Sequence, residues 1–377
     1  MPKTKLHQVA ELGQSIWLDY INRAMIENGK LKERVDNGLR GMTSNPSIFN
    51  QVISASSDYD EKITRLKEAG KSIFEIYDEL TVKDIQDACA IFSDVYKNTN
   101  RLDGYVSLEI NPQLADDTDA SIREGRRLFK KVNRPNVMIK VPATIAGFPV
   151  IEELLADGIN VNVTLIFSLN QYIDTVQAFF RGINRLAQKK TDLSFIASVA
   201  SVFVSRVDTL VDKFLDEKIA SLTEKSAIKK LQELKGKAAV ANSKIIFEKF
   251  KELFASKTFN PLAEKKCAVQ RVLWGSTSTK NPQYNDLKYV TELIASPTVN
   301  TVPENTLNAF LDHGVVKEAL SGKVAQSQKV FKDLEASGIS MDQVCRQLLE
   351  EGVGAFTKAF DDLMKAMETK AKALCKA

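Results

Sequence analysis

The chain contains very little histidine. Only His7 and His313 occur among its 377 residues, and neither lies in a motif-like segment. A Ser/His/Asp triad, or a metal site built on two or three histidines, is therefore close to excluded, and we expect no bound metal. If the protein is an enzyme, its acid–base chemistry must come from carboxylates, lysine, tyrosine or bound water.

Cysteine pairs, nucleotide-binding motifs and long apolar runs are also missing. The four cysteines are far apart and form no CxxC pair, which predicts a reducing compartment and neither a disulfide framework nor a zinc knuckle. No P-loop and no GxGxxG motif occurs, so we expect no nucleotide cofactor. No apolar stretch is long enough to span a bilayer, and none follows the N-terminal residues as in a signal peptide. These features predict a cytoplasmic protein with no cofactor.

Neither sign of charge is in large excess. The chain has 52 lysines and arginines against 48 aspartates and glutamates, a formal net charge of +4. No dense basic stripe interleaved with aromatic residues is present, so we expect no nucleic-acid partner. A mild positive excess suits small anionic substrates.

Short segments rich in β-formers alternate with segments of helical periodicity along the chain. Such alternation predicts βα units and a parallel sheet, and a count of eight strands favours a closed (β/α)₈ TIM barrel over an open doubly wound sheet. We expect the strands at residues 15–19, 39–44, 105–110, 137–141, 159–166, 195–201, 271–275 and 299–302.

Two connections between these strands, 46–104 and 202–270, are much longer than one helix. Both are rich in Lys, Glu, Leu and Ala, so they predict extra helices rather than loose loops. A third helical region, the C-terminal extension 304–377, carries an apolar stripe that includes Phe356 and Phe360. Because no Pro/Gly/Ser linker and no internal repeat occurs, we expect a single barrel domain over 1–377.

Lys140 is the most informative residue of the chain, because it lies inside the apolar run 137–141, between Pro135 and Pro142. An ammonium group there is costly unless it is paired or loses its proton. A lysine neutralised by burial is a nucleophile that can form a Schiff base with a carbonyl substrate. The ordinary alternative is a lysine at a strand end that reaches solvent.

Polar residues lie where the other predicted strands end, and in a (β/α)₈ barrel the catalytic groups lie at the C-terminal ends of the strands. Asp19 ends the first strand, and Glu109 lies at the end of the third. In the fifth strand, Asn160, Asn162 and Thr164 occupy alternate positions and therefore point to one side, which we expect to be the barrel interior. Each residue alone also fits a helix cap or a satisfied polar pair, but so many at one rim predict an active site.

The second, sixth and seventh strands add further polar groups to the same rim. Asn45 follows the second strand, although it could also cap the next helix. Ser201 ends the sixth strand, and Ser198 precedes it. Arg206 and Lys280 follow the sixth and seventh strands, where fixed cations can clamp a phosphate, or else form surface ion pairs.

Several segments resemble the signature segments of the transaldolases. They are residues 41–49 (GMTSNPSIF), 103–109 (DGYVSLE), 138–144 (MIKVPAT) and 158–168 (GINVNVTLIFS), and the match continues through 289–307. The length and the long insertions resemble the larger bacterial and plant-type members.

The resemblance implies a class I, Schiff-base enzyme of the non-oxidative pentose phosphate pathway with a (β/α)₈ fold. Such an enzyme transfers a dihydroxyacetone unit from sedoheptulose 7-phosphate to glyceraldehyde 3-phosphate, which gives erythrose 4-phosphate and fructose 6-phosphate. Its partners would be these sugar phosphates, and a homo-oligomer is compatible with the resemblance.

The resemblance also assigns roles to residues of this chain. Lys140 would form the Schiff base, Asp19 would take the hydroxyl proton during cleavage, and Glu109 with Thr164 would position a water that shuttles protons. The implied substrate-binding residues are Asn45, Asn162 and Ser201 for the dihydroxyacetone hydroxyls, Phe203 for the pocket wall, and Arg206 and Lys280 for the phosphate.

One stretch departs from the smaller family members. Their second phosphate ligand is an arginine close behind a serine, whereas this chain has Lys280 after an apparent one-residue insertion. Lysine lacks the bidentate fork of arginine. Either Thr277 or Ser278 replaces the family serine.

Three alternative functions remain. A fructose 6-phosphate aldolase-like enzyme is disfavoured by Glu109 and Phe203, because those relatives resemble this chain with Gln and Tyr at these positions. A metal-dependent class II aldolase lacks its histidines. A catalytically silent barrel used as a binding protein is disfavoured because Lys140, Asp19 and Glu109 are all present.

Overall fold

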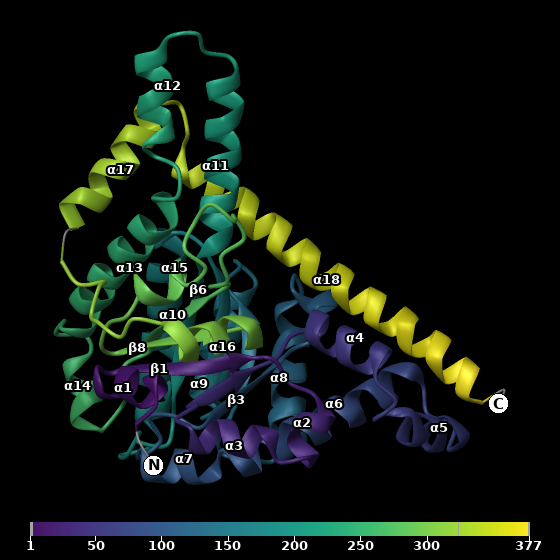
Figure 1. Cartoon of the computed structure of the whole chain (residues 1–377). Helices are drawn as coiled ribbons and strands as arrows, with labels where there is room; N and C mark the ends of the chain where they lie inside the picture. The colour runs from purple at the N-terminus through teal and green to yellow at the C-terminus, as the bar shows by residue number, and fades with distance from the viewer. Residues whose placement is uncertain (1–2, 323, 376–377) are drawn as a thin grey trace.

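The computed structural model describes residues 3–322 and 324–375, and over these residues eight parallel strands form a closed barrel (Figure 1). Each strand pairs with the next along the chain, and β1 pairs with β8 to close the ring. The strands are β1 Gln14–Asp19, β2 Gly41–Thr43, β3 Tyr105–Glu109, β4 Val137–Pro142, β5 Val161–Ile166, β6 Ser198–Phe203, β7 Arg271–Gly275 and β8 Thr298–Val302.

The predicted (β/α)₈ barrel is therefore confirmed, and the strand positions differ from the expected ones by a few residues. The largest shift is in β6, which begins at Ser198 rather than at 195. Just before β6, the Ala197 N–H donates a hydrogen bond to the Asn160 side chain (2.9 Å). This N–H group is therefore not bonded to the backbone of the neighbouring strand.

The helices outside the barrel occupy the connections and the C-terminal region. They are α1 Lys5–Glu11, α2 Arg23–Glu27, α3 Lys30–Asp36, α4 Pro46–Ala55, α5 Asp60–Glu68, α6 Ile73–Ile91, α7 Ser93–Asn98, η1 Pro112–Leu114, α8 Thr118–Val132, α9 Gly147–Ala156, α10 Leu169–Ala187, α11 Ser205–Ala220, α12 Lys225–Gln232, α13 Ala238–Phe254, α14 Asn260–Glu264, α15 Lys288–Thr291, α16 Glu304–His313, α17 Val324–Ala336 and α18 Met341–Leu374.

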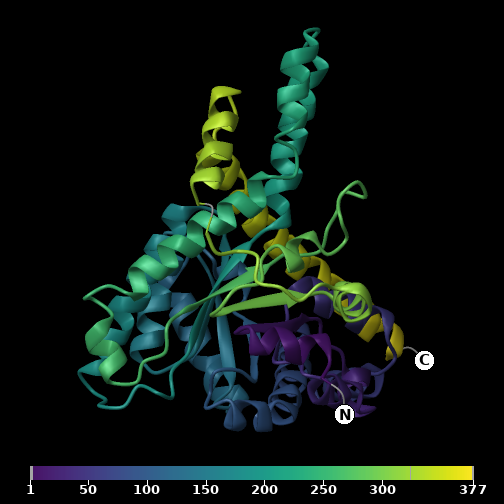
Figure 2. The same cartoon turned by 60° about the vertical axis from the view of Figure 1, so that its left-hand side comes forward.

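Both long connections contain extra helices, as their composition predicts. The connection 46–104 forms α4 to α7, and the connection 202–270 forms α11 to α14. In both views, α11 and α12 form a hairpin that projects away from the barrel (Figures 1 and 2).

Inward-pointing side chains form layers inside the barrel, as in other barrels of this type. The middle layer is apolar, and Gly41 is required beside it because a Cβ at that position would lie 2.6 Å from the Trp17 ring. This layer consists of Trp17, Tyr105, Met138, Val199, Leu273 and Val299. The next inward positions toward the C-terminal ends of the strands are polar.

The 34-residue helix α18 crosses the C-terminal side of the barrel. It contacts β5 and α11, which follows the neighbouring strand β6. It also contacts η1 and α4, which follow β3 and β2 (Figure 1). Val344, Leu348, Phe360, Leu363 and Met367 bury the apolar stripe of the helix. Helix α18 of the C-terminal extension therefore packs over the rim at which the sequence places the polar residues.

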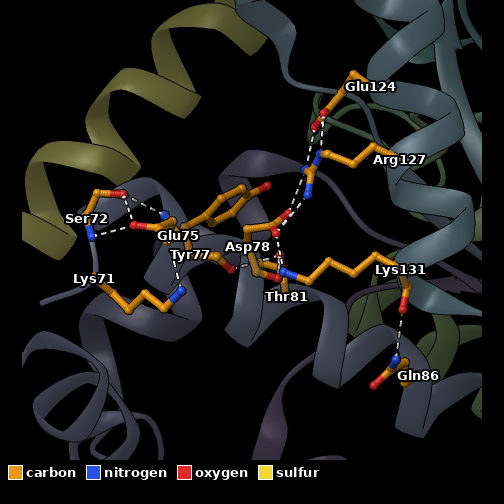
Figure 3. A network of polar contacts seen from close by, with 10 residues as sticks. All are labelled: Lys71, Ser72, Glu75, Tyr77, Asp78, Thr81, Gln86, Glu124, Arg127 and Lys131. Carbon is orange, nitrogen blue, oxygen red and sulfur yellow. Dashed lines mark hydrogen bonds and ion pairs between the residues drawn. The ribbon is translucent and has the colours of Figure 1, made fainter. Parts of the chain in front are cut away.

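A network of ion pairs anchors α6, which supports α18 (Figure 3). Asp78 of α6 accepts two hydrogen bonds from Arg127 of α8 (2.7 and 2.9 Å) and pairs with Lys131. The neighbouring Tyr77 packs edge-on against Phe360 of α18, with ring centres 5.4 Å apart. The buried carboxylate of Asp78, paired with two partly exposed cations, holds α6 on the barrel, and α6 in turn provides an aromatic surface for α18.

Candidate active site

Lys140 lies inside the barrel near the C-terminal end of β4. Val137, Ile139 and Val141 alternate with it and are fully buried, while Met138 and Lys140 point inward. Only 6% of the lysine side chain is exposed. Its Nζ donates a hydrogen bond to the Ser44 carbonyl (3.1 Å). The sequence expectation of a buried lysine amine is confirmed by this geometry.

Glu109, at the end of β3, is the charged partner of this lysine. Its Oε2 lies 3.6 Å from Lys140 Nζ, and it has no hydrogen-bond partner among the residues described. Burial raises the pKa of Glu109 to about 7, an effect that nearby Lys140 opposes and Asp19 reinforces. A carboxyl group that titrates near neutral pH can both give and take a proton under ordinary conditions.

Asp19, the last residue of β1, is the second carboxylate of the site. Burial raises its pKa, while Lys140 and a hydrogen bond from the Thr43 hydroxyl (2.7 Å) lower it. Thr43 also shares a hydrogen bond with Thr301 of β8 (2.8 Å). The two threonines therefore orient the carboxylate from neighbouring strands.

A chain of hydrogen bonds joins β3, β5 and β6 beside the lysine. Asn162 donates to the Ser107 hydroxyl (3.0 Å) and accepts from the Ser201 hydroxyl (2.6 Å). Thr164 lies one inward position further along β5, and its buried hydroxyl has no hydrogen-bond partner among the described residues. The unpartnered hydroxyl can bind a water or a substrate group.

Nine of the ten predicted site residues line one cavity of about 240 Å³. Glu109 is the exception, because it contacts Lys140 from the side and lines a separate, small cavity. The nine residues are Asp19, Asn45, Lys140, Asn162, Thr164, Ser201, Phe203, Arg206 and Lys280.

Some of the predicted polar residues have a structural role, either as a helix cap or as a hydrogen-bond partner of the backbone. Asn45 caps α4, because its side chain accepts a hydrogen bond from the Ile48 N–H (3.0 Å). Asn160 and Ser198 lie outside the cavity and hydrogen-bond backbone carbonyls of neighbouring segments.

The two cationic side chains that are predicted to bind the phosphate line the same cavity. Arg206 is the second residue of α11, and its guanidinium carbon lies 5.4 Å from the ring centre of Phe203. Lys280 is exposed on the loop after β7. In this loop Ser278 lines the cavity, whereas the buried Thr277 donates its hydroxyl to the Thr301 carbonyl (3.0 Å). Ser278 is therefore better placed than Thr277 to contact a ligand.

Sequence reasoning missed Phe356 of α18, together with Thr43 and Thr301. The Phe356 ring lines the cavity, and its centre lies 5.6 Å from Lys140 Nζ. The periodic stripe of α18 indicated only a packed helix face. Within that stripe Phe360 is fully buried while Phe356 is half-buried, but the sequence does not distinguish the two positions.

Among the described residues, no group of three or more His, Cys, Asp or Glu side chains is arranged to hold a metal ion. In the same part of the chain, no helix combines the length and the apolar character needed to cross a bilayer.

Comparison with known proteins identifies the family of the chain. The family described as Transaldolase/Fructose-6-phosphate aldolase matches residues 16–367. A protein named Transaldolase from Trichodesmium erythraeum is 43% identical, over 99% of each chain. Proteins of the same name from Saccharopolyspora erythraea and Mycobacterium marinum are 44% and 41% identical, over 97% and 98% of each chain. With a barrel, a buried lysine and matches along nearly its whole length, the chain belongs to the transaldolase/fructose-6-phosphate aldolase family.

Proposed function

We propose that this chain is a transaldolase. It moves a dihydroxyacetone unit from sedoheptulose 7-phosphate to glyceraldehyde 3-phosphate and forms erythrose 4-phosphate and fructose 6-phosphate. The observation that carries the proposal is the buried Lys140 amine, 3.6 Å from Glu109, in a cavity that also contains Asp19 and two cations. The names of relatives that match almost the entire chain agree with this activity.

Bond cleavage begins with the Lys140 amine. The neutral nitrogen attacks the ketose carbonyl carbon, and loss of water leaves an iminium ion. Asp19 removes the proton from the hydroxyl of the departing fragment while the adjacent carbon–carbon bond breaks. The electron pair of that bond moves into the iminium and forms an enamine, so no free carbanion arises.

Transfer reverses these steps on a second sugar phosphate. The enamine carbon attacks the acceptor aldehyde, and Asp19 returns its proton to the new hydroxyl. Water then adds to the regenerated iminium, and the product ketose and the free amine separate. Glu109 and the Thr164 hydroxyl, which has no hydrogen-bond partner within the described part of the chain, transfer the protons of this water.

The remaining residues of the cavity bind the substrate. Asn162 and Ser201 are already oriented by their mutual hydrogen bond (2.6 Å), and with Asn45 they contact the dihydroxyacetone hydroxyls. Phe203 forms part of the wall. Arg206 and Lys280 clamp the phosphate, with Ser278 beside them.

Reductive trapping tests the proposal directly. The chain is incubated with fructose 6-phosphate and borohydride, and the labelled peptide is identified by mass spectrometry. The expected adduct is on Lys140, and Lys140→Ala should trap nothing and transfer nothing. An adduct on another lysine, or a fully active Lys140→Ala, refutes the assignment. A complete absence of adduct in the parent chain supports the silent-barrel alternative.

The nearest alternative activity is cleavage of fructose 6-phosphate to free dihydroxyacetone and glyceraldehyde 3-phosphate. Glu109 and Phe203 argue for transfer, because the resembling aldolases carry Gln and Tyr at these positions. Product analysis with and without an aldehyde acceptor separates the two activities. A chain that releases dihydroxyacetone as fast with the acceptor as without it is an aldolase.

Domain extent, assembly and compartment remain predictions from the sequence. We propose one barrel domain over 1–377, without a nucleic-acid partner, in the cytoplasm, with a homo-oligomer open to test. Limited proteolysis and light scattering on the purified chain check the first and last points.

A further inference from the structure

Phe356 lines two cavities at the C-terminal side of the barrel. The larger one, called the sugar cavity below, measures about 240 Å³ and contains Lys140. The smaller one measures about 20 Å³ and contains Glu109. The ring of Phe356 borders both.

The small cavity has room for a water molecule beside a carboxylate. A volume of about 10–15 Å³ is enough for one water. Ile110, Pro112, Leu165 and Val353 give it largely apolar walls. Glu109 is its charged group, with an Oε2 that is buried and unpartnered among the described residues.

The Phe356 ring also lies close to the reactive nitrogen. Lys140 Nζ lies 5.6 Å from the ring centre, within the range of a cation–π contact. A protonated iminium formed at the same nitrogen is also a cation, so it keeps this contact. The ring therefore borders a water-sized space and also contacts the nitrogen that carries the covalent intermediate.

Packing on both sides of Phe356 fixes α18 in this position. One turn before it, Gly352 approaches β5 so closely that a Cβ would lie 3.0 Å from the Leu165 side chain. One turn after it, Phe360 packs against Tyr77, on the helix anchored by the ion pairs of Figure 3. The Cys345 thiol contacts the Phe167 carbonyl at 3.3 Å.

We propose that Phe356 is a specificity-determining residue that limits water at the covalent intermediate, so that the dihydroxyacetone unit is transferred rather than released. This inference rests on the proposed transaldolase function. It gives the C-terminal helix a role in the reaction through one side chain.

The competing release is a hydrolysis with a defined course. The enamine carbon first takes the proton that Asp19 gained during cleavage and becomes an iminium. A water oxygen then bonds to the iminium carbon while Glu109 takes one water proton. Glu109 gives this proton to Nζ, and the carbon–nitrogen bond breaks with its electron pair going to Nζ. The carboxylate of Glu109 then takes the remaining O–H proton as the carbonyl forms. The products are free dihydroxyacetone and the lysine amine. Because the ring lines both cavities, removing it enlarges the space in which water can reach this step.

The test measures release and transfer in the same reaction. Fructose 6-phosphate is the donor and erythrose 4-phosphate the acceptor, and free dihydroxyacetone and sedoheptulose 7-phosphate are quantified over time. Phe356→Ala should raise the ratio of release to transfer about tenfold, which corresponds to about 1.4 kcal/mol of altered barrier. Phe356→Leu should raise it less, because the leucine fills part of the space.

Phe360→Leu is the matched control, since this ring is on the same helix, one turn away, and borders neither cavity. It should lower the unfolding midpoint without changing the ratio. The proposal is overturned if Phe356→Ala leaves the ratio unchanged, or if Phe360→Leu raises it as much as Phe356→Leu. If Phe356→Ala does not fold, Phe356→Leu decides alone. A parent chain that makes no sedoheptulose 7-phosphate refutes the proposed function instead.

Discussion

Lys140 can be buried because three kinds of group lower the cost of its charge. Glu109 provides an opposite charge, the Ser44 carbonyl accepts a hydrogen bond, and the Phe356 ring provides a weaker electrostatic contact. When the lysine loses its proton, Glu109 is the nearest described carboxylate. The nucleophile and a proton carrier are therefore paired before any substrate binds.

The two carboxylates should have separable roles, because only Glu109 pairs directly with Lys140. We expect Asp19→Ala to form the trapped adduct but to cleave slowly. Glu109→Gln should slow formation and hydrolysis of the iminium. Each change should reduce the affected rate by roughly 10²–10⁴. Single-turnover trapping and product formation, measured side by side, check this. Identical defects in both assays would refute the division of roles.

The raised pKa of Glu109 predicts two pH effects. First, kcat/KM should increase with pH up to about 7, because the ionised Glu109 carboxylate is the proton acceptor. Glu109→Gln should remove this dependence on pH.

Stability should change in the opposite direction. Below 4.5, the usual pKa, the carboxyl is protonated in both folded and unfolded chains. Between 4.5 and about 7 the unfolded chain ionises first, so the free energy of unfolding falls as pH rises. Urea unfolding at several pH values checks this, with Glu109→Gln as the control that should lose this part of the slope.

The phosphate clamp should show its effect mainly in KM. A charge-assisted contact from Arg206 or Lys280 contributes about 1.5–3 kcal/mol, and the phosphate is remote from the breaking bond. Arg206→Ala and Lys280→Ala should therefore raise KM for fructose 6-phosphate, with a smaller loss in kcat. Activity with unphosphorylated fructose should hardly change. If Lys280→Ala impairs both donors equally, Lys280 has a structural role.

At the scale of elements, α11 and the loop after β7 depend on each other. Tyr284 of the loop donates to Asp212 of α11 (2.6 Å), and Tyr289 of α15 donates to Asp208, one turn earlier on α11 (2.8 Å). The other oxygen of Asp212 accepts from the Gly236 N–H, just before α13, and that of Asp208 accepts from the Ala239 N–H, in the first turn of α13. Because α11 carries Arg206 and the loop carries Lys280, these bonds fix the two cations relative to each other.

Loss of one of these bonds should therefore affect phosphate binding. We expect Tyr284→Phe to raise KM for fructose 6-phosphate by up to about tenfold, equivalent to about 1.4 kcal/mol, with little change for fructose. Tyr105→Phe is the matched control, because its hydroxyl donates to the Arg101 carbonyl (2.7 Å), outside the sugar cavity. Equal changes in KM for the two variants would show that the bond does not act through the clamp.

At the scale of the whole molecule, polar groups occupy both ends of the barrel interior, and an apolar layer separates them. At the N-terminal end, Arg271 pairs with Asp103 (2.8 Å) and also donates to Ser15 (2.8 Å). About 5% of the Arg271 and Asp103 side chains is exposed. Charges buried so fully stay in place only when each is paired.

Breaking this pair should lower stability and leave the chemistry intact. Asp103→Asn leaves a buried arginine without its counter-charge, which costs about 3–5 kcal/mol. Urea unfolding should show the loss, while kcat of the folded chain stays unchanged. Asp362→Asn, which breaks an exposed pair with Lys358, should have a much smaller effect. The interpretation fails if the two variants are equally destabilised.

Local sequence determined the fold class and the cluster of polar residues at one rim. Eight β-rich segments separated by helical ones predict the barrel. Side chains at alternate positions of a strand point to opposite faces, so the position of a residue decides whether it points inward. Asp19, Lys140 and Thr164 could therefore be assigned to the cavity without coordinates. Their catalytic roles remain predictions.

Tertiary structure alone decided three further points. It placed Phe356 over Lys140, separated Glu109 from the sugar cavity, and turned Thr277 away from it while Ser278 faces it. More than two hundred residues lie between Lys140 and Phe356 along the chain. Periodicity shows which face of a helix is apolar, but the surface that this face covers depends on the packing of α18 against α4, α6 and β5. A contact between distant segments is set by this packing, which no local pattern encodes.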